Sequence, residues 1–191
     1  MTTNNKIELM APAGNFESLQ AALDNGCDSV YFGVEQLNMR ARASVNFTMD
    51  DLAEIAKRCE AKNVRSYLTL NTIIYDHDLS VVKTLINKAK EANITAVIAS
   101  DQAVIAMARS VGMEVHISTQ LNVTNIETIK FYSLFADTMV LSRELSLRQV
   151  KKITEQIEKE QIKGPNGNLV EIEIFGHGAL CMAVSGKCYL S

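Results

Sequence analysis

Two cysteines near the end of the chain have the residue type and the setting of metal ligands. Cys181 and Cys188 lie in the segment EIFGHGALCMAVSGKCYLS, residues 173–191, which contains three glycines. Glycine permits backbone conformations that other residues avoid, so two thiols on such a segment can converge on one point without a helix. Thiolates are the soft ligands that iron–sulfur clusters and zinc prefer. Their separation is not a common paired-ligand spacing, so ordinary buried cysteine is an equally good interpretation from spacing alone.

A second group of polar residues follows the ends of predicted strands. It comprises Asn71, His116, Gln120, Arg143, Glu144 and His177, with Arg40 and Arg42 in a long loop after the second strand. In a parallel barrel, functional side chains gather at the carboxyl ends of the strands. Arginine in that position suits a carboxylate or phosphate, which its planar fork binds bidentately.

Each of these residues also has a purely structural interpretation. Arg40 and Arg42 fit solvated loop charges equally well. Glu144 can serve as an acidic residue near a helix start, where the helix dipole favours it. His116 fits a hydrogen-bonded core or rim residue better than a ligand, whereas His177 lies inside the cysteine-bearing segment.

The elements that must position these residues alternate regularly. Short apolar runs predict seven strands, at residues 7–11, 29–33, 66–70, 96–99, 114–117, 138–141 and 170–175. Six amphipathic helices separate them, with N-caps expected at Asn15, Thr48, Ser100, Thr124 and Ser146. Alternation of this kind predicts βαβ units and a parallel sheet, hence an α/β fold.

Two cysteines belong to this framework. Cys59 falls on the apolar stripe of a predicted helix, and Cys27 lies at a turn between a helix and a strand. We therefore expect both to be structural.

Two architectures are compatible with the alternation: a closed eight-stranded barrel and an open doubly wound sheet. No G-x-G-x-x-G turn follows the first strand, which argues against a dinucleotide-binding sheet. A barrel that lacks its eighth strand leaves strands one and seven with open edges. We therefore expect a fragment of a longer protein or a barrel completed by other means.

Composition narrows the class of protein. With 191 residues and 47% hydrophobic content, the chain has enough apolar material for one substantial core. The net charge of −3 gives no global basic field for nucleic acid, although a local basic patch or a further domain would still allow RNA binding. The opening residues lack a signal-peptide pattern, and no apolar stretch reaches the roughly 18 residues of a membrane span. Four cysteines without a leader indicate thiols or metal ligands in a cytoplasmic protein.

The terminal segment resembles the signature of the collagenase-like peptidase U32 family. The matching positions are Glu173, Phe175, Gly178-Ala179-Leu180-Cys181, Gly186, Cys188, Leu190 and Ser191. The segments ELMAPAGNFESLQAAL, HISTQLN and LSRELS also look like the family. The resemblance implies a (β/α)8 TIM-barrel-like fold, here incomplete. It also implies that residues 1–191 form one barrel-like domain, the N-terminal portion of a longer member.

The resemblance implies two kinds of activity. Some members are described as collagenase-like proteases, while others resemble iron–sulfur proteins that hydroxylate nucleosides in tRNA or rRNA, or a ring in ubiquinone synthesis. In the iron–sulfur members four cysteines bind a 4Fe–4S cluster, and prephenate is implicated for the RNA hydroxylases. By position, Cys181 and Cys188 match the first two cluster ligands; the other two lie beyond Ser191.

Three hypotheses follow. The first is RNA base hydroxylation by a longer cluster-containing form, with Glu144, Arg143, Gln120 and His177 as catalytic candidates and Arg40, Arg42, Asn71 and His116 as substrate-binding candidates. The second is a peptidase, for which the sequence offers neither H-E-x-x-H nor G-x-S-x-G, only Cys181 close to His177. The third is a non-catalytic scaffold that needs a missing C-terminal region or another subunit.

Overall fold

Seven parallel strands form a single curved sheet whose order follows the chain. The computed structural model describes residues 7–34, 37, 47–178 and 181–187. The strands are β1 (Met10–Pro12), β2 (Ser29–Gly33), β3 (Arg65–Leu70), β4 (Ala96–Ala99), β5 (Glu114–Ile117), β6 (Thr138–Val140) and β7 (Glu171–Glu173). Each pairs in parallel with the next, from β1 through to β7. The predicted seven-stranded parallel sheet is confirmed.

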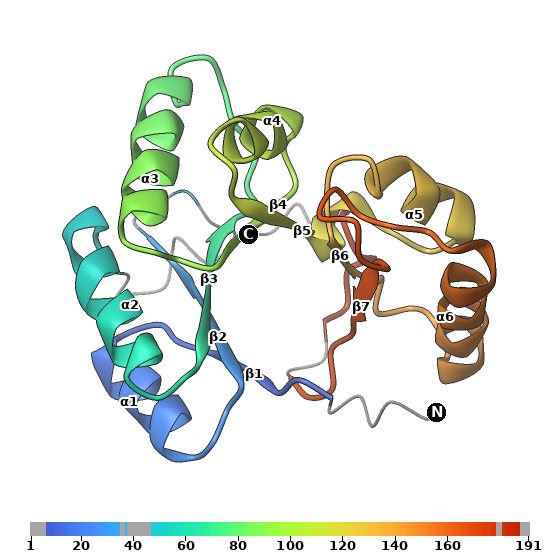
Figure 1. Cartoon of the computed structure of the whole chain (residues 1–191), viewed down its shortest axis with the longest axis horizontal. Coiled ribbons are helices and arrows are strands. Elements are labelled where there is room, and N and C mark those ends of the chain that lie inside the picture. Colours follow the sequence, from blue (N-terminus) through green and yellow to red (C-terminus); the bar gives the residue numbers. More distant parts are fainter. Residues whose placement is uncertain (1–6, 35–36, 38–46, 179–180, 188–191) are drawn as a thin grey trace.

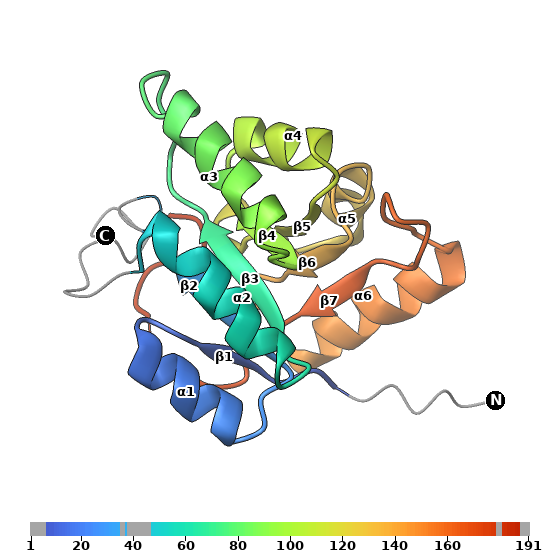
Figure 2. The same ribbon diagram turned by 60° about the vertical axis from the view of Figure 1, so that its left-hand side comes forward.

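The helices cover the outer side of this sheet (Figure 1). They are α1 (Phe16–Asp24), α2 (Leu52–Glu60), α3 (Leu79–Glu91), α4 (Gln102–Ser110), α5 (Ile126–Tyr132) and α6 (Leu147–Glu160). Figure 2 shows the strands curving around a common interior with the helices outside them, as in a TIM barrel. Among the described residues, β1 and β7 are the outer strands of the sheet and do not pair with each other.

Side-chain caps start most of the helices, and three of the five predicted N-caps are confirmed. Asn15 begins α1 with a capping box, and Ser146 begins α6 in the same way. Thr48 also forms a capping box, but it opens a short 3₁₀ helix (Met49–Asp51) that leads into α2.

The caps predicted for α4 and α5 are each wrong by one residue. Asp101, not Ser100, accepts a hydrogen bond from the Ala103 N–H at 2.8 Å. Asn125, not Thr124, accepts one from the Thr128 N–H at 3.0 Å. In both places two good capping residues stand side by side, and the later one carries the carboxylate or amide oxygen that reaches the open N–H groups.

The main hydrophobic core lies between the outer face of the sheet and the helices. Cys27 and Cys59 are buried in it, as expected for structural cysteines. Burial raises the pKa of the Cys59 thiol to about 11, so this group stays protonated at neutral pH. Neither cysteine is available as a thiolate ligand.

A second, smaller cluster fills the inside of the curved sheet. It is built on Tyr67, Ala96 and Ile98, with Met10 and Tyr31 packed against it. These side chains stand on the opposite face of their strands from the main core, because successive residues of a strand point to opposite sides. The inside of the sheet is therefore a separate environment, and its remaining positions carry the polar groups described below.

No helix in the described part of the chain is long and apolar enough to cross a membrane.

The N-cap of α1 gives a direct test of the local structure. We expect Asn15→Ala to lower the free energy of unfolding by about 1 kcal/mol, because the Ser18 N–H, 2.8 Å from Asn15 Oδ1, loses its partner. Asn15→Ser should retain most of the stability, since serine caps nearly as well. Denaturant unfolding of the three proteins measures the difference, and equal stability of Asn15→Ala and wild type would contradict this assignment.

Candidate functional site

The segment after β7 is held against the strand-end loops through one buried serine. Ser185 is only 1% exposed. The Arg143 backbone N–H and Nε both donate to its hydroxyl, at 3.3 and 3.4 Å, and its own N–H donates to Glu144 Oε1 at 2.7 Å. Arg143 and Glu144 directly precede α6, in the loop that leaves β6. Arg143 and Glu144, which follow β6, thus fix the segment that follows β7.

A close backbone contact fixes the neighbouring residue as well. Gly186 has a φ of +72°, and a Cβ built at this position would lie 2.3 Å from the carbonyl oxygen of Gln120. Gln120 belongs to the short 3₁₀ helix that follows β5 (Thr119–Leu121). Only glycine satisfies both the positive φ and this approach. The segment is therefore pinned to the loops after β5 and β6 at two consecutive residues.

Electrostatic contacts reinforce this anchor. The Arg143 guanidinium lies over the ring of Phe175, 5.9 Å from its centroid. The Ser185 N–H holds the pKa of the Glu144 carboxyl below its usual range, because the hydrogen bond favours the ionised form. Of the predicted catalytic residues, Arg143, Glu144 and Gln120 thus come together around the signature segment. Their part in catalysis stays a prediction.

The segment presents its first cysteine to solvent. Cys181 is exposed, and it lies four residues before the buried anchor Ser185. His177, the fourth predicted catalytic residue, is also exposed. Cys188, Arg40 and Arg42 lie outside the described residues. Within the described ranges, no three His, Cys, Asp or Glu side chains are grouped to bind a metal ion.

Hydrogen bonds also link the loops that follow β3, β5 and β6. Asn71 Nδ2, at the end of β3, donates to Ser118 Oγ at the end of β5, with a separation of 3.2 Å. The Ser142 hydroxyl after β6 donates to Asn122 Oδ1 at 2.7 Å. Asn71, a predicted substrate-binding residue, therefore lies at the strand-end face, where it links two strands.

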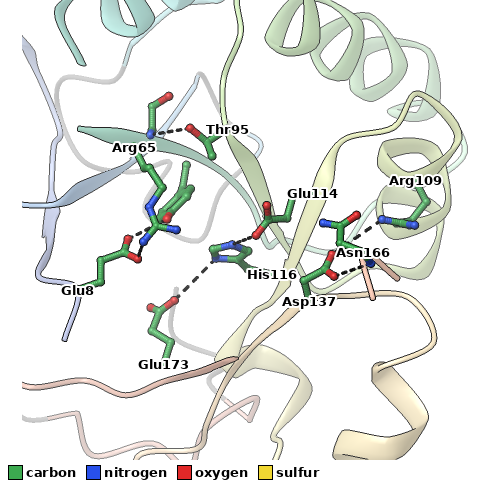
Figure 3. Close-up of polar contacts among 11 residues, drawn as sticks. Glu8, Arg65, Thr95, Arg109, Glu114, His116, Asp137, Asn166 and Glu173 are labelled. Carbon is green, nitrogen blue, oxygen red and sulfur yellow. Dashed lines mark hydrogen bonds and ion pairs between the residues drawn. The ribbon is translucent and has the colours of Figure 1, made fainter. Parts of the chain in front are cut away.

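The inside of the barrel holds a second polar group, drawn in Figure 3. His116 on β5 is 4% exposed. Its Nε2 lies 3.2 Å from Glu114 Oε1, its Nδ1 lies 4.0 Å from Glu173 Oε2, and its ring packs on that of Tyr67 with 4.6 Å between centroids. Met10, Tyr67, His116 and Glu173 lie on β1, β3, β5 and β7, respectively. Four inward side chains from alternate strands form one layer of a TIM barrel.

Charged groups continue below this layer. Arg65 forms an ion pair with Glu8, and the Tyr67 hydroxyl donates to the same carboxylate at 2.8 Å. The hydrogen bond from His116 lowers the pKa of Glu114. Burial raises the pKa of Glu173, which the nearby His116 only partly offsets. Layers that are usually filled by branched apolar residues are here polar and titratable.

Glu173 and Glu114 were not predicted as site residues, and His116 was expected only as a satisfied core residue or a substrate contact. The signal for Glu173 was present: it stands in an apolar predicted strand and opens the cysteine signature. Its direction could not be read, because period-two alternation does not say which set of side chains faces inward until the helices are placed.

We expect Gly186→Ala to disturb the anchor. The added methyl group cannot fit 2.3 Å from the Gln120 oxygen, so the segment must shift, at a cost of about 1–3 kcal/mol. Limited proteolysis should then cut residues 174–187 faster than in wild type. Gly176→Ala is the control, because a Cβ at that position meets nothing within 4 Å. Equal cleavage in both variants would rule out the tight contact.

The stability effect of Glu173 should depend on pH. Because its folded-state pKa is raised, this carboxyl stabilises the fold most below its ordinary pKa, and that contribution is lost as pH rises through the raised value. Glu173→Gln should therefore raise the free energy of unfolding at neutral pH, with a smaller gain at pH 4. Denaturant unfolding at the two pH values tests this, and a loss of stability at neutral pH would mean that the His116 interaction dominates.

Comparison with known proteins gives consistent results. The family model "Peptidase family U32" matches residues 14–191. The chain is 57% identical over 98% of its length to a collagenase of Porphyromonas gingivalis, and 32% identical over 97% to tRNA hydroxylation protein P1 of Bacillus subtilis. It is also 32% identical over 99% to the 23S rRNA 5-hydroxycytidine C2501 synthase of Escherichia coli. The chain spans 45%, 42% and 27% of these relatives, respectively.

A solved U32 peptidase has the same fold as this chain. The two superpose with a TM-score of 0.66 at 14% identity, and the match covers 91% of this chain and 69% of the other. The family match extends over both the anchored cysteine segment and the strands that carry His116 and Glu173. The chain therefore belongs to peptidase family U32.

Proposed function

We propose that this chain is the barrel part of a protein that hydroxylates a base in tRNA or rRNA with the help of a 4Fe–4S cluster. In this proposal Cys181 and Cys188 are two of four thiolate ligands, and the other two come from residues beyond this chain. The site would work in the cytoplasm on RNA, with prephenate as an associated small molecule.

One observation carries the proposal: the cysteine-bearing segment is anchored at Ser185 and Gly186, while Cys181 is exposed. Ser185 and Gly186 are pinned by Arg143, Glu144 and Gln120, whereas Cys181 faces solvent. A cluster ligand needs this combination, because the sulfur must reach an iron atom and yet be held in place. The other described thiols, Cys27 and Cys59, are buried in the core and are unsuitable.

The donor chemistry fits the cluster. Cys181 is an exposed cysteine on a non-helical, glycine-containing segment. Arg143, which is bonded to Ser185 of the same segment, adds a positive charge that would favour an anionic, thiolate-rich group. When bound, a 4Fe–4S cluster would supply one-electron redox chemistry at the strand-end face.

RNA as the substrate is supported by the names of relatives. Proteins 32% identical over almost the whole chain act, by name, in tRNA hydroxylation and in synthesis of 5-hydroxycytidine in 23S rRNA. The net charge of −3 indicates that this chain does not supply most of the phosphate contacts. We therefore assign those contacts to parts of the longer protein or to a partner subunit.

Peptide hydrolysis is the second candidate, because the P. gingivalis relative at 57% identity is named a collagenase. Ser185 does not suit the role of its nucleophile. The hydroxyl is buried and accepts two hydrogen bonds from Arg143, so it is held as a structural acceptor. A peptidase mechanism on the described residues would have to use Cys181, with His177 from the same segment.

The first test is iron and acid-labile sulfide content after anaerobic purification of the longest form of the protein. We expect nearly stoichiometric cluster in wild type and its loss in Cys181→Ala and Cys188→Ala. Cys27→Ala is the matched control: it also removes a thiol, but a buried one, so the cluster should persist. A folded protein without iron would exclude the cluster.

The same proteins can separate the two candidate reactions. Deletion of the gene should remove a nucleoside one oxygen atom heavier than its parent from digests of cellular RNA. Wild type and Cys27→Ala should restore it, and Cys181→Ala should not. If gelatin is cleaved by wild type but not by Cys181→Ala, and RNA nucleosides are unchanged, the peptidase function is correct instead.

A further inference from the structure

The buried histidine inside the barrel lies between two carboxylates from different strands. Glu114 faces Nε2 of His116 at 3.2 Å, and Glu173 faces Nδ1 at 4.0 Å (Figure 3). Only 4% of the surface of His116 is exposed, and its Nδ1 has no hydrogen-bond partner within the described part of the chain. The same holds for Glu173 Oε2. Two buried polar atoms that face each other without a bond are uncommon and call for an explanation.

Glu114 determines how the imidazole is protonated. An ionised carboxylate only accepts hydrogen bonds, so the close contact requires His116 to carry a proton on Nε2. The lowered pKa of Glu114 agrees with this arrangement. In the neutral ring, Nδ1 is then a bare acceptor that faces Glu173.

At 4.0 Å, Nδ1 and Glu173 Oε2 are too far apart for a direct hydrogen bond, and one proton on either atom would allow them to approach to hydrogen-bond distance. Without it, two buried acceptor atoms face each other, which is costly. With it, either the carboxylic acid donates to Nδ1 or the imidazolium donates to the carboxylate. The two forms differ only in the position of a single proton.

We propose that His116 and Glu173 form a buried acid–base pair that holds one shared proton beneath the cysteine-bearing face, with Glu114 as the positioning residue. Once a side-chain rotation brings the two atoms to hydrogen-bond distance, a proton passes from Glu173 Oε2 to His116 Nδ1. This leaves a carboxylate and an imidazolium whose Nε2–H still donates to Glu114. The reverse transfer restores the starting state, so no other reactant is needed.

The position of the pair gives this proton a route from the barrel interior toward the strand-end face. Glu173 is the last residue of β7, and the chain runs directly from it into the segment that carries Cys181. Its side chain is 24% exposed although Oε2 is buried. On β3, the next inward residue beyond Tyr67 toward the strand ends is Thr69, whose hydroxyl is also buried without a partner among the described residues. Polar groups thus continue from the pair toward the strand-end face.

Other charged groups around the pair belong to the lower layer. Arg65 on β3 is neutralised by Glu8, which also accepts from the Tyr67 hydroxyl. Glu171 on β7 is exposed and lies two residues before Glu173. Of the described carboxylates, only Glu114 and Glu173 lie within 4.0 Å of the imidazole nitrogens.

The inference goes beyond the proposed function and does not depend on the substrate, since both hydroxylation of a base and hydrolysis of a peptide involve proton transfer. It is tested by nitrogen-15 NMR of histidine-labelled protein, in the longest form that can be purified. His116→Gln identifies the signal of His116. The exposed His77 and His177 provide references in the same spectrum.

We expect Glu173→Gln to lower the titration midpoint of His116 by about one pH unit or more, because an opposite charge or shared proton beside the ring is removed. Glu171→Gln removes the same charge from the same strand and should leave the midpoint nearly unchanged. Glu114→Leu removes the acceptor and should release the ring from the single Nε2–H tautomer. A dispersed His116 signal shows in each variant that the barrel is folded.

Equal midpoints for Glu173→Gln and Glu171→Gln would overturn the shared proton. An unchanged tautomer in Glu114→Leu would overturn the role of Glu114. Absence of iron or of RNA modification would reject the proposed function but leave these titrations unaffected, so the two ideas fail separately.

Discussion

Parallel pairing of β1 to β7 is the constraint on which the other features depend. Once neighbouring strands are in register, every second side chain must point into the barrel, whatever its chemistry. In most barrels these positions are apolar. Here they hold a tyrosine, a histidine and several carboxylates, of which Tyr67 and His116 are buried and the carboxylates are partly exposed.

The two polar regions of the molecule are linked by the course of one short stretch of chain. Glu173 ends β7 inside the barrel, and twelve residues later Ser185 is buried under Arg143 and Glu144 on the strand-end face. Between them lies the exposed Cys181. The acid–base pair and the thiol thus share a scaffold, although one is buried and the other is in contact with solvent.

Sequence reasoning predicted the fold well because its signals are local. Apolar runs marked all seven strands, and capping residues marked the starts of most helices, with an error of one residue where Asp101 and Asn125 displaced Ser100 and Thr124. The site was harder to predict. Arg143 and Glu144 could be placed after a strand, but their bonds to Ser185 join residues about 40 positions apart, and no local pattern encodes such a contact. The pairing of His116 with Glu173 likewise requires the curvature of the sheet.

The two ends of the cysteine-bearing stretch are held by different means, and this affects how it can evolve. Glu173 is fixed by the ladder of β6 and β7, and Gly186 by its contact with Gln120. Of the described residues between them, 176–178, 181, 182 and 184 are exposed, so substitutions there meet little steric resistance. The position of Gly186 is different, because any other residue there would meet the carbonyl oxygen of Gln120. The stretch is therefore constrained at its two fixed ends, while the exposed residues described between them can change more freely.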